Sequence, residues 1–252
     1  MSADQPAERA PAPLWRPLLA EWLGSAFLAA IVVGSGIAAQ QLSPGNIGLD
    51  LLENAAATAA GLYAIILMFG PVSGAHFNPV VSFVDAAFGG LRWRNAAAYL
   101  PAQVTGCITG AIAANVTYGR AAVSISTHHR VTGGHLLSEI IATLGLLLVI
   151  FALTRTHRGA SAAAAVGAYI GAAYFFTSSA SASFANPAIT IGRTLSDTFA
   201  GIAPASAPAY IAAQMLGGIA AVAAIKTLYP NLTPANASEI LVPHRLESSE
   251  PH

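Results

Sequence analysis

Two copies of an Asn-Pro-small tripeptide interrupt a chain that otherwise consists mainly of long apolar stretches. The first copy covers residues 78–80 and the second covers residues 186–188. Asparagine is a preferred helix N-cap and proline is favoured at the first helical position, so each copy predicts a short helix that begins abruptly. A helix N-terminus carries about half a positive charge and unpaired N–H donors. Two such ends inside a membrane would form a site that binds oxygen atoms and disfavours cations.

The composition is that of a membrane protein. Of 252 residues, 55% are hydrophobic and only 9% are charged, against about 25% charged in soluble proteins. The formal net charge is zero, so nothing indicates a nucleic-acid partner. Cys107 is the only cysteine and lies in an apolar run, which excludes an internal disulfide and a cysteine metal site. We therefore expect a lipid bilayer as the surroundings and no cofactor or bound metal.

Six apolar stretches are long enough to cross a bilayer, which takes about 20 residues as a helix. They lie near residues 17–39, 51–70, 96–118, 137–154, 161–180 and 207–228. Two shorter apolar pieces, about 79–89 and 187–196, begin at the Asn-Pro pairs and are interpreted as half-helices. Irregular backbone at membrane depth is tolerated only where protein buries it or where it lines a watery cavity. The Asn-Pro loops therefore predict a cavity.

The distribution of basic residues predicts the orientation. An even number of spans places both termini on one side, and with cytoplasmic termini the inner segments hold eight basic residues and the outer segments three. The inner ones are Arg9, Arg16, Arg92, Arg94, Arg155, Arg158, Lys226 and Arg245, and the outer ones are Arg120, Arg130 and Arg193. We expect a disordered cytoplasmic tail over 1–14, a membrane domain over 15–228 with repeats 15–118 and 136–228, and a cytoplasmic tail over 229–252.

The two halves of the chain repeat the same order of motifs. Glu21 opens the first span and Glu139 the fourth, while Ala-Gln-x-x-Gly recurs at Gln103 and Gln214. Each half thus runs Glu, Asn-Pro, Ala-Gln-x-x-Gly. Three spans per half is an odd number, so the halves must insert upside down relative to each other. Inverted repeats with broken helices that meet at the midplane are typical of permeation proteins.

In these motifs the chain resembles the major intrinsic protein family, the aquaporins and aquaglyceroporins, over nearly all of residues 15–228. The resemblance implies an all-α membrane protein with six transmembrane helices plus two re-entrant half-helices, as an inverted 3+3 repeat. It also implies a passive channel rather than an enzyme, with one pore per subunit of a homotetramer in the cell (inner) membrane. The expected pore motifs are Asn78, Pro79, Val80, Asn186, Pro187 and Ala188. Val80 departs from the family's usual alanine and is expected to narrow the junction slightly.

Several polar residues near the spans have two possible roles. Glu21 and Glu139 are costly at membrane depth, so they serve either proton coupling or, as the family implies, hydrogen-bonded support of the half-helix loops. Gln103 and Gln214 are interpreted as buried partners of the same loops. His76, two residues before Asn78, is either pore-lining and pH-sensing or a structural histidine.

The outer constriction is where the chain departs from the family. Carried over by distance from the two asparagines, the four selectivity positions are Thr58, Tyr174, Ser183 and Ile189. Nearly the whole family has arginine where this chain has Ile189, so the constriction is expected to be less polar and less positive. Arg193, one helical turn later, is expected to lie away from the constriction.

The segment from residue 181 to 202 resembles a bacterial subgroup of aquaglyceroporins associated with arsenic resistance. This implies passage of small neutral solutes, namely glycerol-like molecules and neutral metalloids such as arsenite and methylated arsenicals, with some water. A water-selective aquaporin is the alternative within the family. An ion-coupled secondary transporter and a membrane-junction protein with a vestigial pore are the alternatives outside the channel class.

Overall fold

The computed structural model describes residues 13–155, 159–177 and 184–230, and these residues form helices and no strand. The long helices are α1 (Trp15–Leu42), α2 (Ile47–Ser73), α4 (Trp93–Thr117), α5 (Gly133–Arg155), α6 (Ala162–Phe176) and α8 (Ala207–Leu228). Two short helices, α3 (Pro79–Ala87) and α7 (Pro187–Gly192), begin at the Asn-Pro pairs. Single 3-10 turns are η1 (Gly159–Ser161), η2 (Arg193–Leu195) and η3 (Pro204–Ser206).

The six spans and two half-helices predicted from the sequence are confirmed. All six long helices, α6 together with η1, are long and apolar enough to cross a membrane. α1, α2 and α5 extend past both predicted ends because these helices continue beyond the apolar core. α2 passes through Pro71 and stops at Gly74, whose φ of 85° ends the helix. α6 stops at Phe176, before Thr177 turns extended, whereas the sequence predicted a span to residue 180.

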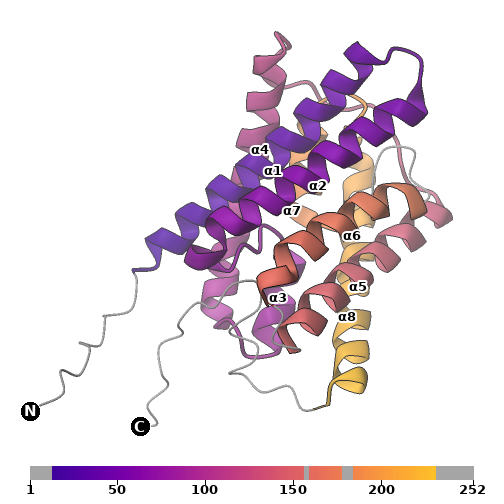
Figure 1. Cartoon of the computed structure of the whole chain (residues 1–252). Helices are drawn as coiled ribbons and strands as arrows, with labels where there is room; N and C mark the ends of the chain where they lie inside the picture. Colours follow the sequence, from indigo (N-terminus) through magenta and orange to yellow (C-terminus); the bar gives the residue numbers. More distant parts are fainter. Residues whose placement is uncertain (1–12, 156–158, 178–183, 231–252) are drawn as a thin grey trace, which may run out of the picture.

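The long helices form two groups that repeat each other. α1 packs against α2 and α4 in the first half, and α5 packs against α6 and α8 in the second (Figure 1). The closest approaches are equivalent glycines. A Cβ atom on Gly106 of α4 would lie 2.4 Å from the carbonyl oxygen of Trp22, and one on Gly217 of α8 would lie 2.6 Å from that of Ile140. A side chain at either glycine would therefore push two spans apart.

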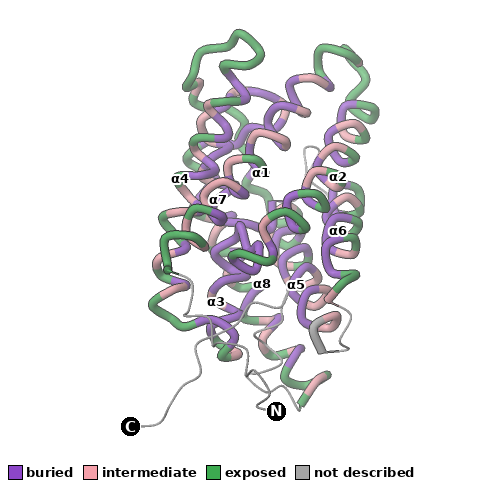
Figure 2. Tube along the Cα trace, turned by 60° about the vertical axis from the view of Figure 1, so that its left-hand side comes forward, coloured by how far each residue is buried: buried purple, intermediate pink, exposed green. Residues whose placement is uncertain are grey.

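The half-helices occupy the interior between these groups. α3 packs against α4 and α8, and α7 packs against α4, α8 and α1. In Figure 2 the two lie one above the other, and their residues are almost all buried. Large apolar side chains are exposed instead on the outer faces of the long helices, among them Phe27, Leu67 and Ile219. This pattern, with the polar half-helix ends inside and the apolar surface outside, is that of a membrane-embedded bundle.

Candidate functional site: a cavity between two half-helices

Both half-helices start from an asparagine cap followed by proline. The side-chain oxygen of Asn78 accepts a hydrogen bond from the backbone N–H of Val80 at 3.0 Å. That of Asn186 accepts one from Ala188 at 2.9 Å. Each asparagine has an extended backbone and the next residue is the proline that opens the helix, so the abrupt starts predicted from the sequence are confirmed.

The two asparagines also join the halves to each other. The side-chain amide of Asn78 donates to the carbonyl of Ala185, and that of Asn186 donates to the carbonyl of Phe77, each at 2.7 Å. Phe77 and Ala185 directly precede the asparagines and have φ values of 48° and 46°. A left-handed backbone costs a non-glycine residue about 1–3 kcal/mol, so the reciprocal bonds hold both loops in a conformation they would not adopt alone.

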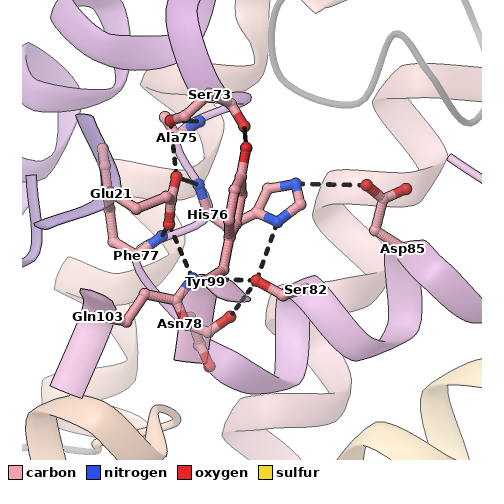
Figure 3. A network of polar contacts seen from close by, with 10 residues as sticks. All are labelled: Glu21, Ser73, Ala75, His76, Phe77, Asn78, Ser82, Asp85, Tyr99 and Gln103. Carbon is pink, nitrogen blue, oxygen red and sulfur yellow. Dashed lines mark hydrogen bonds and ion pairs between the residues drawn. The ribbon is translucent and has the colours of Figure 1, made fainter. Parts of the chain in front are cut away.

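In the first half, one carboxylate fixes the loop before α3 (Figure 3). Glu21 is fully buried. One of its oxygens accepts from the hydroxyl of Ser73 at 2.6 Å and the backbone N–H of His76 at 2.9 Å. The other accepts from the backbone N–H of Phe77 and from the amide of Gln103, each at 2.7 Å. All the donors are buried, so the carboxylate satisfies groups that have no water nearby.

The second half repeats this arrangement. Glu139 is also buried and accepts from the backbone N–H groups of Phe184 and Ala185, each at 2.8 Å. The amide of Gln214 donates to the same carboxylate at 2.7 Å and to the hydroxyl of Thr190 at 2.9 Å. The structure therefore brings each Glu and Gln of the repeat to the loop of its own half.

His76 lies in a polar cluster that the sequence did not suggest. Its Nδ1 lies 3.0 Å from the hydroxyl of Ser82, and its Nε2 lies 3.4 Å from a carboxylate oxygen of Asp85 (Figure 3). The side chains of His76 and Asp85 are both fully buried. An ionisable residue inside a half-helix too short to span is a signal in itself, and it could have drawn attention to Asp85 from the sequence alone.

A cavity of about 60 Å³ lies between the two half-helix loops and the long helices. Asn78, Asn186 and His76 lie on its wall, and so do three of the four residues that the sequence predicts as selectivity positions. These three are Thr58, Tyr174 and Ile189. The hydroxyls of Thr58 and Tyr174 lie 2.9 Å apart and hydrogen-bond to each other, while Ile189 contributes only hydrocarbon. The fourth position, Ser183, lies outside the described residues. A single water needs about 10–15 Å³ of such space, so the cavity has room for several water-sized groups.

Val80 does not meet the expectation that it narrows the junction. Its side chain is buried against α8 rather than on the described cavity wall, where its neighbour Val81 lies instead. A Cβ atom on Gly218 would lie only 2.6 Å from Val80 Cγ1. The extra bulk of valine over alanine is therefore accommodated by the glycine of α8.

Arg193 also differs from expectation, because it lies on the cavity wall. Its guanidinium carbon is 3.6 Å from the centre of the Phe184 ring, and its Nε donates to the carbonyl of Ala200. The expectation assumed that the Arg193 side chain lies at the same height along the helix as its own Cα atom. Helical side chains point back towards the helix N-terminus, over the preceding turn. A long side chain at 193 therefore reaches towards the level of Ile189.

The loop from residue 118 to 132 packs against the segment between α7 and α8. Arg130 is buried there and donates to the carbonyls of Gly201 at 2.7 Å and Phe199 at 2.9 Å. Burial lowers the pKa of Arg130 to about 10, so the guanidinium stays charged at neutral pH. At the rim, the backbone N–H of Thr127 donates to Asp197 at 2.9 Å and is the main cause of a lowered pKa of that carboxyl.

Within the described part of the chain, no group of three or more histidine, cysteine, aspartate or glutamate side chains could hold a metal ion. Most polar side chains of the site instead hydrogen-bond to the two loops or to one another. The side chains of Asn78 and Asn186 lie on the wall of the cavity between the half-helices.

An apolar bundle of six spans around paired, asparagine-capped half-helices defines the class of the molecule, a membrane channel. The chain matches the family described as Major intrinsic protein over residues 8–184 and 158–250, and it belongs to that family. It is an aquaglyceroporin-type member rather than an enzyme.

Similar proteins agree with this assignment. The chain is 43% identical over 215 residues to the aquaglyceroporin AqpS of Rhizobium meliloti, which covers 85% of this chain and 91% of the relative. It is 31% identical over 182 residues to the aquaporin NIP1-4 of Oryza sativa subsp. japonica, which covers 71% of this chain and 65% of the relative. The aquaglyceroporin of Plasmodium falciparum has the same fold, with a TM-score of 0.66 at 20% identity over 87% of this chain and 99% of that one.

Proposed function

We propose that this aquaglyceroporin passes small neutral solutes larger than water, namely glycerol-like molecules and neutral metalloids such as arsenous acid and methylated arsenicals, together with some water. The observation that carries the proposal is that the apolar side chain of Ile189 lines the same cavity as the hydrogen-bonded hydroxyls of Thr58 and Tyr174. A relative with 43% identity carries the name aquaglyceroporin, which supports the same solute class.

The constriction residues suit a solute with both polar and apolar faces. The linked hydroxyls of Thr58 and Tyr174 present oxygen atoms that donate to or accept from a solute hydroxyl. Ile189 presents hydrocarbon to the carbon backbone of glycerol or to the face of a methylated arsenical. An arginine at residue 189 would supply fixed donors and would narrow the passage, and both changes favour water over larger solutes.

At the centre of the cavity we assign the asparagines to solute contact. Each side-chain amide has two N–H groups and donates one of them to the carbonyl of the opposite loop. The second is left to donate to a passing oxygen, beside two positive helix ends that repel protons and cations. Glu21, Gln103, Glu139 and Gln214 then serve as loop supports, because all four direct their polar atoms at the loops or at one another.

We further propose a homotetramer in the inner cell membrane with cytoplasmic termini, around a channel domain of residues 15–228. The excess of basic residues in the inner segments supports the orientation. Exposed apolar side chains on the outer faces of the long helices, such as Phe27 and Ile219, offer surface to lipid and to neighbouring subunits. Cross-linking in membranes and accessibility labelling of single cysteines placed in the tails would test these assignments.

The decisive experiment is stopped-flow light scattering on proteoliposomes that hold the purified full chain. We expect rapid, non-saturating influx of glycerol and arsenous acid, with slower entry of both in the Ile189→Arg variant. Ile189→Val is the matched control, since it keeps the constriction apolar. Fast water flux with exclusion of both solutes would identify a water-selective aquaporin and refute the proposal.

The buried His76–Asp85 pair favours a second candidate, an ion-coupled transporter, because such proteins place ionisable pairs at membrane depth. The two candidates differ in kinetics. A transporter would show saturable solute flux that depends on a proton or sodium gradient, and a channel would show neither dependence.

A further inference from the structure

The two halves carry buried charges of opposite sign at equivalent positions. Asp85 lies seven residues after Asn78 at the end of α3, and Arg193 lies seven residues after Asn186, just beyond α7. Their exposed fractions are 0% and 1%. Each contacts the residue two places before the asparagine of its own half, His76 for Asp85 and Phe184 for Arg193. The inverted repeat thus places one charge near each end of the passage.

The two charges differ in their relation to the cavity. Arg193 forms part of the cavity wall together with Tyr174, Phe184 and Ile189, whereas Asp85 lies behind His76 and is not on the described wall. The positive charge therefore acts directly on the contents of the passage, while the negative one acts through the imidazole that stands before it.

The contacts of Arg193 orient its guanidinium while preserving its charge. The Phe184 ring lies at 3.6 Å, a cation–π distance, and the Ala200 carbonyl accepts from Nε. These two contacts, the cation–π contact and the bond to a neutral carbonyl, both favour the charged form of the guanidinium. A positive charge on the wall of a narrow passage repels cations, because the field is little screened there.

We propose that Arg193 is the residue that excludes cations from the outer half of the passage, acting from one turn beyond Ile189. The apolar side chain at 189 and the charge at 193 then divide two tasks: Ile189 leaves room for a larger neutral solute, and Arg193 keeps the passage closed to ions. This inference rests on the proposed function for the identity of the solute, but the exclusion of ions does not depend on that solute.

The test compares Arg193→Met, which keeps length without charge, with Arg193→Lys, which keeps charge. Purified full-length protein in liposomes is loaded with a sodium-sensitive or a chloride-sensitive dye, and leak of each ion is measured beside glycerol influx. Arg120→Gln serves as the matched control, since Arg120 is an exposed cation of the outer loop. We expect sodium leak to rise about tenfold in Arg193→Met, the factor for a unit charge about 10 Å away at an effective dielectric constant of about 20, with chloride leak unchanged or lower.

Rescue separates a charge effect from damage to the fold. Arg193→Lys and Arg120→Gln are expected to leak no more sodium than the parent protein. Equal rises in sodium and chloride leak, or no rise at all in Arg193→Met, would overturn the inference. If the parent protein excluded glycerol and arsenous acid yet the selective sodium leak appeared, the proposed function would fail and this inference would stand.

Discussion

The loops before α3 and α7 share one scaffold and differ in what they place on it. In both, a buried glutamate accepts two consecutive backbone N–H groups, and a glutamine from a long helix donates to that glutamate. In both, a hydroxyl four residues after the asparagine donates to the asparagine carbonyl, from Ser82 at 3.2 Å and from Thr190 at 2.8 Å.

The two halves differ in the side chains two residues before and seven residues after each asparagine. The first loop carries His76 with Asp85, and the second carries Phe184 with Arg193. The supporting contacts thus follow the twofold relation of the repeat, whereas these side chains, of which His76, Phe184 and Arg193 line the cavity, do not. The comparison suggests that the repeat maintains geometry and that selectivity arises where the halves have diverged. Four experiments test this division, from the largest expected effect to the smallest.

Replacing a supporting carboxylate should affect either half severely. Glu21→Ala or Glu139→Ala leaves at least two buried backbone donors without an acceptor, and each costs about 1–3 kcal/mol. We expect each to lower the free energy of unfolding by about 2–6 kcal/mol, measured by thermal unfolding in detergent. The Glu→Gln variants keep an acceptor and should lose less. If only one half were sensitive, the claim of a shared scaffold would be wrong.

Packing between α3 and α8 should require a small residue at Gly218 opposite the larger Val80 side chain. Gly218→Ala places a methyl group 2.6 Å from Val80 Cγ1, so we expect a loss of about 1–3 kcal/mol from overpacking. Adding Val80→Ala should restore much of it. Gly133→Ala is the control, because nothing lies within 4 Å of a Cβ there. The absence of recovery in the double variant would show that the two positions do not pack as described.

The His76–Asp85 contact should be energetically coupled. A double-mutant cycle with His76→Phe and Asp85→Asn is expected to give a coupling free energy of about 1 kcal/mol, as for buried polar neighbours. His76→Phe reproduces the aromatic ring that the second half carries. The same cycle between His76 and the distant Asp197 should give no coupling. Additive effects for His76 and Asp85 would mean that the two side chains do not stabilise each other.

The smallest effect is expected at the outer rim. The backbone N–H of Thr127 lowers the pKa of Asp197 below its ordinary 3.8, so its stabilising contact is present above about pH 4 and is lost as the pH falls through the lowered pKa. Asp197→Asn should speed amide hydrogen exchange at Thr127 at pH 7 by less than about tenfold, since exposed contacts contribute under about 1 kcal/mol. Parent and variant should converge as the pH falls through the lowered pKa of Asp197; a difference that persists once this carboxyl is protonated would contradict the assignment.

Sequence patterns were sufficient for the helices and for the identities of the paired residues. Apolar length predicted six spans, and the chemistry of Asn-Pro predicted two abrupt helix starts, because both are local properties. Contacts across the bundle were not predictable in this way. The place of Val80 depends on a glycine in α8, far along the chain. The place of Arg193 depends on how far a long side chain reaches back along its helix, which residue offsets do not express.

The reciprocal amide bonds between Asn78 and Ala185 and between Asn186 and Phe77 have a consequence for biosynthesis. A ribosome releases the first loop into the membrane well before residues 185 and 186 have been translated. Until they arrive, the Phe77 carbonyl lacks the partner that the second loop supplies. The nascent first half is therefore a temporarily incomplete intermediate, and closure of the passage is coupled to insertion of the second half. Chains truncated between the repeats should accordingly be recognised and degraded by membrane quality-control proteases.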